Sequence, residues 1–204
     1  MPSGIGQLRR LLPITLFAVS TGVSLVLSML LVASHTPYLA QPGSLQAFAG
    51  RLGEGGLGDA GRGSWRAVHL LAAGCACSRG VAEHLVSRGL LPGAREQVVF
   101  AGASPDLAGR LRHAGFRVYT MSQEDIVLQF GIVAAPLLVI ISPQDRIRYA
   151  GGYTPGRDAR TGYQDVAIWR QTVAGRDVAE LPIYGCAVGH RLQRSLDPLG
   201  LKYQ

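Results

Sequence analysis

The sequence has few charged residues, few cysteines and almost no lysine. Charged residues make up 16% of its 204 residues and hydrophobic residues 48%, which excludes a disordered acidic or basic tail protein. Three cysteines are too few for a scaffold held together by disulfides. Lys202 is the single lysine, and the arginines behind the net charge of +7 are mostly dispersed, without interleaved aromatic residues. We therefore expect no nucleic-acid partner.

An uncharged segment of 24 residues, 11–34, follows Arg9 and Arg10 near the N-terminus. A helix of this length spans the hydrocarbon layer of ~30 Å, so we expect residues 11–34 to contact the lipid bilayer. Arginines stay on the cytoplasmic side, which predicts a single-pass protein of the inner membrane with its C-terminal part in the periplasm or at the cell exterior. The alternative is a signal peptide cleaved at 32–34, although the apolar region is long for one.

The sequence divides into three predicted parts. Residues 1–34 are predicted to be a membrane anchor or uncleaved signal. Residues 35–64 are predicted to be a linker, because eight glycines lie between Gly43 and Gly63. Residues 65–204 are long enough for one ordinary domain with a C-terminal extension.

Strand and helix signals alternate within 65–204. Short apolar runs of strand length are separated by segments with helical spacing, and a turn with proline and aspartate precedes the last strand. The predicted strands are 65–72, 97–101, 116–120, 137–141 and 147–153, and the predicted helices are 79–88, 104–115 and one that starts at 122. This pattern predicts an α/β fold, a mixed sheet flanked by helices.

The stretch 131–153 resembles the thioredoxin-like superfamily. A Gly-Ile pair ends a helix, Ala135-Pro136 follows, and then come a strand, a tight turn and a second strand. The sequence GCAC at 74–77 stands between a strand and a helix, at the family's active-site position. As a whole the chain is similar to membrane-anchored bacterial thioredoxin-like proteins of undefined activity. The resemblance implies a cis peptide bond before Pro136, in a loop that holds the backbone groups of Ala135 open to an extended substrate.

The CxC motif departs from the CxxC motif of that family. Residues two apart on a helix point roughly 200° away from each other, so a disulfide between Cys75 and Cys77 needs non-helical backbone. Two alignments are open: Cys75 as nucleophile with Ser78 in the second position, or Cys77 with Gly80. We prefer the first because His69 then lies six residues upstream, where the family often keeps a buried ionisable group that accepts a proton. The alternative for His69 is a structural histidine bonded to the backbone.

Three functions compete for this motif. The resemblance implies a thiol–disulfide oxidoreductase in which Cys75 attacks and Cys77 resolves, acting on protein or small thiol and disulfide substrates, with no cofactor and no resident metal. Copper binding or delivery is the second, but relatives with that function use CxxxC and a later histidine, and residues 120–165 contain none. The third is an anchored binding module without redox turnover.

Cys186 is either a packed residue or a further resolving thiol. It belongs to a C-terminal segment, 183–196, in which Cys186, Gly189 and His190 share one face at helical spacing. Because the segment has few large apolar residues, we expect it to lie against the domain surface as a helix. Docked near the start of the first helix of the domain, it would bring a third thiol to the CxC loop.

Overall fold

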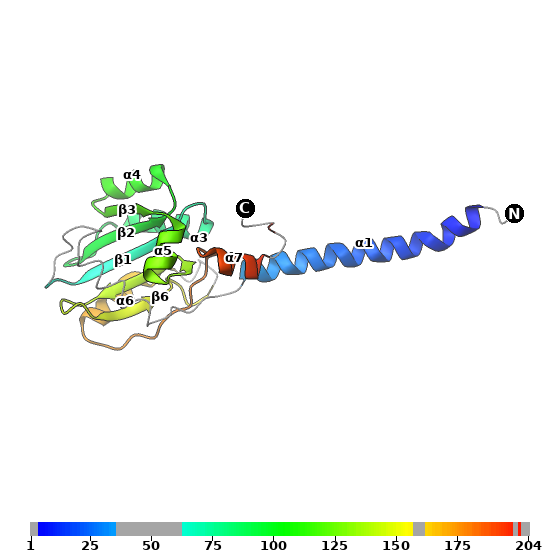
Figure 1. Cartoon of the computed structure of the whole chain (residues 1–204). Coiled ribbons are helices and arrows are strands. Elements are labelled where there is room, and N and C mark those ends of the chain that lie inside the picture. The colour runs from blue at the N-terminus through cyan, green and yellow to red at the C-terminus, as the bar shows by residue number, and fades with distance from the viewer. Residues whose placement is uncertain (1–3, 36–62, 157–161, 198–199, 201–204) are drawn as a thin grey trace. The chain divides into compact units, whose positions relative to one another are not determined.

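The chain divides into two compact units, residues 1–36 with 194–204 and residues 37–193. The predicted linker, 35–64, lies outside the described residues except at its two ends. The residues that the computed structural model describes are 4–35, 63–156, 162–197 and 200 (Figure 1).

The N-terminal helix α1 (Gly4–His35) contains the predicted apolar span. Its segment Leu12–Val32 has a mean hydropathy of 2.1 and is long and apolar enough to cross a membrane. Pro13 lies inside the helix, and the hydroxyl of Thr15 donates to the carbonyl of Leu12 at 2.9 Å. The large apolar side chains along this segment are mostly exposed, as expected of a helix that faces lipid.

A five-stranded mixed sheet forms the centre of the second unit, which confirms the predicted fold class. The central strand β1 runs parallel to β2 and antiparallel to β5, and β2 runs parallel to β3. β5 and β6 form the predicted antiparallel pair. In the order in which they pair, the strands are β3 (Arg117–Met121), β2 (Arg95–Ala101), β1 (Arg66–Ala72), β5 (Leu137–Ile141) and β6 (Ile147–Gly151).

The three helices at 76–88, 105–113 and 123–130 lie close to the positions that the sequence predicts, whereas the helix at 165–173 was not predicted. At the start of α5, the hydroxyl of Ser122 accepts from the backbone N–H of Asp125 at 3.0 Å and so caps the helix that the sequence predicts to start at 122. Gly131 ends this helix in the left-handed conformation with φ of 65°. The helices of this region are α3 (Ala76–Arg88), α4 (Pro105–His113), α5 (Gln123–Phe130), α6 (Asp165–Val173) and α7 (His190–Leu196).

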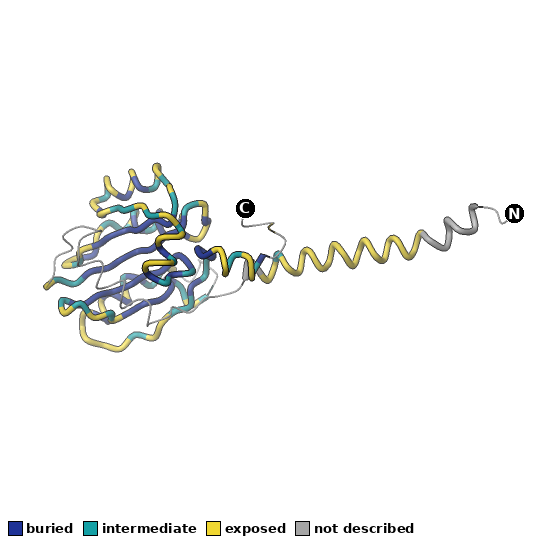
Figure 2. The backbone as a smooth tube through the Cα atoms, in the orientation of Figure 1, coloured by how far each residue is buried: buried dark blue, intermediate teal, exposed yellow. Residues whose placement is uncertain are grey.

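Apart from the edge strand β3, the strands of the sheet are buried along most of their length (Figure 2). All seven residues of β1 are buried. On one face, apolar residues of α3, α4 and α6 pack against Leu71 and Phe100. Val68 and Leu70 point the other way and are equally buried, and Figure 1 shows α5 crossing in front of the sheet. The active-site turn therefore starts from a rigid strand.

The chain after α6 returns along β6. The backbone N–H of Gly152 donates to the carbonyl of Leu181 at 2.8 Å. A Cβ on Gly152 would lie 2.0 Å from the carbonyl oxygen of Pro182, so only glycine allows this approach. The segment then forms a small second sheet, in which β7 (Cys186–Ala187) pairs with β4 (Ala134–Ala135).

Candidate active site

The CxC motif lies at the turn between β1 and α3. Gly74 has a φ of +74°, which glycine adopts without a steric penalty, and it turns the chain out of the strand. Cys75 then caps α3 with extended backbone, φ −88° and ψ 120°, whereas Cys77 lies in the first helical turn. Only 4% of Cys75 is exposed, while Cys77 is exposed. All three cysteines of the chain are thiols in this structure. Cys75 and Cys77 differ strongly in how accessible they are to solvent.

Ser78 occupies the position three residues after Cys75. It is buried, and its hydroxyl accepts from the backbone N–H of Ala72 at 3.0 Å. The hydroxyl thus ties the start of α3 to the end of β1. This placement agrees with the first alignment, in which a serine stands where CxxC proteins have their second cysteine.

The loop before β5 approaches the CxC turn. Ala135 and Pro136 are joined by a cis peptide bond, as the resemblance implied. Pro136 and Cys77 line the same pocket. The expectation that the backbone of Ala135 is open to a substrate is wrong, because Ala135 lies opposite Cys186 in the β4–β7 pair and has no exposed surface.

Cys186 reaches this loop through a strand and not through a helix. The prediction of a helix over 183–196 is wrong in its first half, since Cys186 belongs to β7 and α7 begins only at His190. The segment is also no surface attachment, because Val188 is fully buried. Its two paired residues find their partners some 50 positions earlier in the chain, a contact that local spacing does not reveal. The expected proximity to the CxC loop is nevertheless present, since Cys186 contacts Cys75.

Gly185 allows this close approach. A Cβ at this position would lie 1.8 Å from the carbonyl oxygen of Ala135 and 2.6 Å from Cδ of Pro136. No side chain fits between two backbones at that distance. The missing side chain of Gly185 therefore sets how near Cys186 comes to the nucleophile position.

The thiol of Cys75 is in a strongly acidifying environment. Hydrogen bonds from the side chains of Cys186 and Cys77, in that order, lower its pKa from 9.0 to about 2, and those from the backbone and hydroxyl of Ser78 add to the effect. Burial acts in the opposite direction but is outweighed. The surroundings of Cys75 therefore favour its thiolate form, because the two other thiols donate hydrogen bonds to it.

The Cys186→Ala variant tests this environment. We expect the pKa of Cys75 in the reduced protein to rise by on the order of 1–3 units, because the largest stabilising hydrogen bond is lost. The measurement is the ultraviolet absorbance of the thiolate as the pH is lowered. Cys77→Ala should cause a smaller rise, and Cys75→Ser should remove the acidic transition altogether. An unchanged transition in Cys186→Ala would contradict the assigned contact.

A pocket of about 310 Å³ opens beside Cys77. Aromatic rings form much of its wall, and a Cβ on Gly80 would lie 2.8 Å from the hydroxyl of Tyr163. The pocket is thus a concave, largely apolar site with Cys77 in its wall. Its lining includes Cys77, Gly80, Pro136, Tyr153, Tyr163 and Tyr184.

Three features identify the fold. They are the order of the strands, the hairpin of β5 and β6, and the cis-proline loop, which shares a pocket with the start of α3. The fold is thioredoxin-like. The sequence resemblance to that superfamily therefore holds at the level of structure.

A solved structure with a similar fold is known, although sequence comparison finds no match. No family model matches the chain, and no curated protein matches its sequence. An uncharacterized conserved protein from Geobacillus kaustophilus is similar in structure, with a TM-score of 0.52 and 15% identity over 76% of this chain and 89% of that chain. At this identity the likeness concerns the fold alone.

Two structures with TM-scores below 0.5 were also found. One is a secreted disulfide oxidoreductase from Mycobacterium tuberculosis, with a TM-score of 0.41 and 10% identity over 55% of this chain and 83% of that chain. The other is the thioredoxin domain of a thiol-disulfide oxidoreductase from Bacteroides vulgatus, with a TM-score of 0.33 and 16% identity over 42% of this chain and 68% of that chain.

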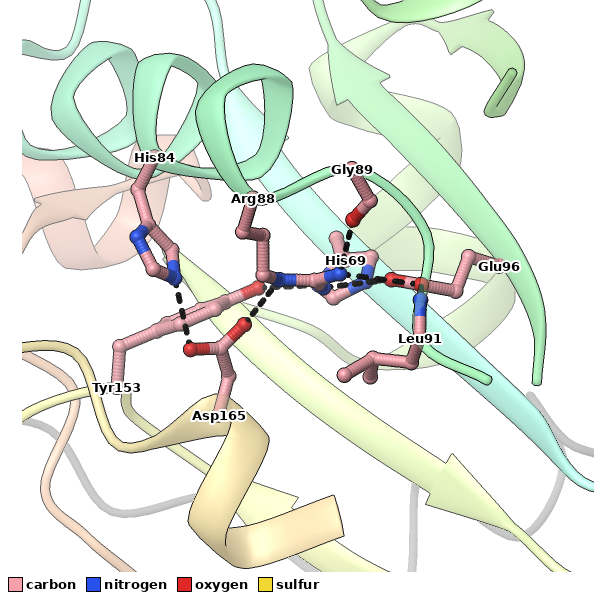
Figure 3. A network of polar contacts seen from close by, with 8 residues as sticks. All are labelled: His69, His84, Arg88, Gly89, Leu91, Glu96, Tyr153 and Asp165. Atoms are coloured by element: carbon pink, nitrogen blue, oxygen red, sulfur yellow. Dashed lines mark hydrogen bonds and ion pairs between the residues drawn. The ribbon is translucent and has the colours of Figure 1, made fainter. Parts of the chain in front are cut away.

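His69 is fully buried in the thioredoxin-like domain and is bonded to side chains (Figure 3). Its Nε2 lies 2.9 Å from a carboxylate oxygen of Glu96, and its Nδ1 lies 2.7 Å from the hydroxyl of Tyr153. Since a carboxylate only accepts, Nε2 donates, and in the neutral imidazole Nδ1 accepts from Tyr153. Tyr153 also lines the pocket beside Cys77, so His69 is connected to the pocket through one hydroxyl group.

The same network extends across the domain through Arg88. Its guanidinium donates to Glu96 at 2.6 and 3.1 Å and to Asp165 at 2.7 Å, and His84 lies 2.8 Å from the other oxygen of Asp165 (Figure 3). Burial would raise the pKa of Glu96, but hydrogen bonds from His69 and Arg88 outweigh it and lower that pKa to about 2. Burial would likewise raise the pKa of Asp165. The hydrogen bond with His84 and the charge of Arg88 outweigh it and lower that pKa to about 2.

Sequence reasoning missed most of this network. His69 was identified, but Arg88, Glu96 and Asp165 were not, since each stands alone in the sequence. The one available signal was Glu96, a carboxyl group directly before the apolar run 97–101. No group of three or more histidine, cysteine or acidic side chains that could hold a metal is present among the residues that the structure describes.

Proposed function

We propose that the chain is a membrane-anchored thiol–disulfide oxidoreductase whose thioredoxin-like domain works outside the cytoplasm. The observation that carries the proposal is the meeting of three thiols at the start of α3, where Cys75 is hydrogen-bonded to Cys77 and Cys186. Exchange needs one thiolate to attack and a second thiol to release the mixed disulfide. This cluster supplies both.

The low pKa of Cys75 indicates the direction of the reaction. A disulfide that contains a cysteine of low pKa is broken readily, because the thiolate that leaves is already stable. Stabilising the reduced form in this way makes the disulfide more oxidising. The oxidised domain is therefore proposed to act as an acceptor of electrons from other thiols.

His69 is proposed to act through Tyr153. Thiolates that leave in the pocket need protons, and thiols that attack must lose them. Tyr153 lines the pocket, and its hydroxyl is bonded to His69, so the pair supports a path by which a proton moves between the pocket and the buried imidazole. In this role His69 is a positioning residue and proton acceptor behind Tyr153.

The membrane anchor is supported by the apolar segment Leu12–Val32. Arg9 and Arg10 precede it in the sequence, which favours an N-terminus in the cytoplasm and a domain in the periplasm or at the cell exterior. That space is oxidising, so a disulfide between the active-site cysteines persists there. Residues 35–64, rich in glycine, are proposed to tether the domain to the anchor.

A reporter fused after Lys202 tests this topology. We expect a reporter that needs an oxidising compartment to be active and a cytoplasmic reporter to be silent, because the two arginines keep the N-terminus inside. Replacing Arg9 and Arg10 by glutamate should lower the share of chains in this orientation. An active cytoplasmic fusion would contradict the proposed location.

Thiol trapping across a graded glutathione buffer tests the function. The full chain in detergent should change from three trapped thiols to one, and the midpoint should lie at a potential more positive than that of the cytosolic glutathione pool. Metal content is measured on the same sample. Three trapped thiols at every ratio would contradict the proposal, and a stoichiometric bound metal would favour the copper alternative instead.

A further inference from the structure

The backbone edge where an extended substrate would pair is already occupied. β7 lies antiparallel to β4 with Cys186 opposite Ala135, and Ala135 has no exposed surface. A peptide that joins a sheet as an additional strand needs an unpaired edge. While β7 is in place, a polypeptide substrate therefore cannot use this edge of β4.

β7, the strand that occupies this edge, also brings the thiol of Cys186 to Cys75. Cys186 is hydrogen-bonded to Cys75, which is the position that a cysteine of a bound polypeptide would take. Cys75 is only 4% exposed, so an external disulfide does not reach it directly. β7 of the chain itself thus occupies the place where a polypeptide substrate would bind.

Cys77 has the opposite properties. It is exposed and lies at the edge of the pocket of about 310 Å³, whose wall includes Tyr153, Tyr163 and Tyr184. This volume is at the lower end of those that hold small molecules. It can take one half of a low-molecular-weight disulfide, but it offers no extended groove for a polypeptide.

We propose that the oxidant from which the reduced domain regains its disulfide is a low-molecular-weight disulfide, that this co-substrate reacts first at Cys77, and that Cys186 is the thiol that finally pairs with Cys75. The inference rests on the proposed oxidoreductase function and names the substrate class of that site. It assigns the first attack to Cys77, whereas the sequence resemblance implied Cys75, because burial denies Cys75 to the solvent.

The electrons balance over three exchanges. The Cys77 thiol gives its proton to the Cys75 thiolate and attacks the small disulfide, so that a Cys77 mixed disulfide forms and one small thiolate leaves. Cys75 then attacks the Cys77 sulfur, which forms the Cys75–Cys77 disulfide and releases the second small thiolate. Finally Cys186 attacks Cys75 and Cys77 leaves. One small disulfide is reduced to two thiols, which take the protons of the Cys77 and Cys186 thiols. Cys75 and Cys186 become the disulfide, and Cys77 is left as the thiolate.

Two measurements on the full chain in detergent test the proposal. In the first, the reduced protein is oxidised with glutathione disulfide, quenched in acid and mapped by peptides, and we expect the Cys75–Cys186 bridge with Cys77 reduced. In the second, the rate of exchange with glutathione disulfide is compared with that of a disulfide-bonded unfolded polypeptide. The small disulfide should react about tenfold faster per disulfide, since the polypeptide must first displace β7.

Gly185→Ala provides the matched variant. Its new Cβ would lie 1.8 Å from the carbonyl oxygen of Ala135, so β7 must move away from β4. We expect the Cys75–Cys186 bridge to be lost, with Cys75–Cys77 in its place, and the preference for the small disulfide to fall. Gly109→Ala is the control, because a Cβ there meets nothing within 4 Å.

The outcomes separate the inference from the function on which it rests. Exchange with neither disulfide, and no bridge after oxidation, would overturn the proposed oxidoreductase itself. Exchange that is as fast with the polypeptide, or an oxidised wild-type chain with only the Cys75–Cys77 bridge, would overturn the substrate class and the role of Cys186 alone. The mapping of the wild-type chain decides this even where Gly185→Ala does not fold.

Discussion

Replacing Cys75 by serine is expected to reduce the turnover of disulfide exchange by on the order of 10³-fold or more, the scale on which loss of a nucleophile acts in other enzymes. Cys75 is the thiol that contacts both others, so neither internal disulfide forms without it. The measurement is steady-state exchange between glutathione disulfide and an added thiol substrate. Ser87→Ala, on an exposed position of α3, should leave the rate unchanged.

The same variant reveals the order of attack. If Cys77 reacts first, Cys75→Ser accumulates a mixed disulfide between Cys77 and the small thiol, because the next attack is missing. If Cys75 reacts first, as the sequence resemblance implied, no mixed disulfide accumulates in this variant, and one accumulates when Cys77 and Cys186 are both replaced by serine, since neither neighbouring thiol is then left to resolve it. Full turnover in Cys75→Ser would contradict both orders.

Replacing Glu96 by alanine is expected to lower the free energy of unfolding of the domain by about 3–5 kcal/mol, the cost of removing one partner from a buried ion pair. The Glu96 side chain has no exposed surface, and its carboxylate accepts hydrogen bonds from His69, from Arg88 and from the backbone N–H of Leu91. Without it, Arg88 keeps a charge with 10% exposure and only Asp165 to balance it.

Urea titration followed by tryptophan fluorescence measures this effect in the full chain. Both tryptophans, Trp65 and Trp169, belong to the thioredoxin-like domain, where their rings lie 6.2 Å apart, so the signal reports this domain. Glu83→Gln, at an exposed position of α3, is the matched control and should change stability by no more than about 0.5 kcal/mol. A loss of similar size in both variants would contradict the importance of the network.

The pH dependence of stability has a definite sign. The pKa of Glu96 is lowered from 4.5 to about 2 in the folded domain, so the folded state binds fewer protons than the unfolded state in this range. The contribution of Glu96 to stability is therefore complete above pH 4.5 and is lost as the pH falls toward 2. In Glu96→Ala this part of the acid destabilisation should be absent, and that of Asp165 should remain.

The sheet could be predicted from the sequence, whereas the complete site could not. The strand LLVII is wholly apolar and lies between a proline and a turn, so its length and position follow from local pattern. β7 has only two residues, and its partner β4 is as short, so no periodicity marks either one. Cys186 was assigned to a helical face because its neighbours at i+3 and i+4 fit that spacing. In the structure, Cys186 lies in a strand because its backbone pairs with that of Ala135, and local sequence does not encode this pairing.

The buried polar network escaped prediction for a related reason. Charged residues that are isolated in the sequence are ordinarily solvated, and only the tertiary fold brings Arg88 and Asp165, 77 positions apart, to one cluster. His69 could be singled out because it lies six residues before Cys75, where the family that the sequence resembles often keeps a buried ionisable group. Its bonds to Glu96 and Tyr153 replace the backbone bond that a purely structural histidine was expected to make.

The position of β7 also determines where the folding unit ends. A conventional boundary for this domain would follow α6, the last helix that packs on the main sheet. A fragment that stopped there would leave β4 with a bare edge, uncover Cys75 and expose the glycine surfaces against which the returning chain packs. The shortest autonomous fragment therefore extends at least to Val188, and the C-terminal segment is an integral part of the domain.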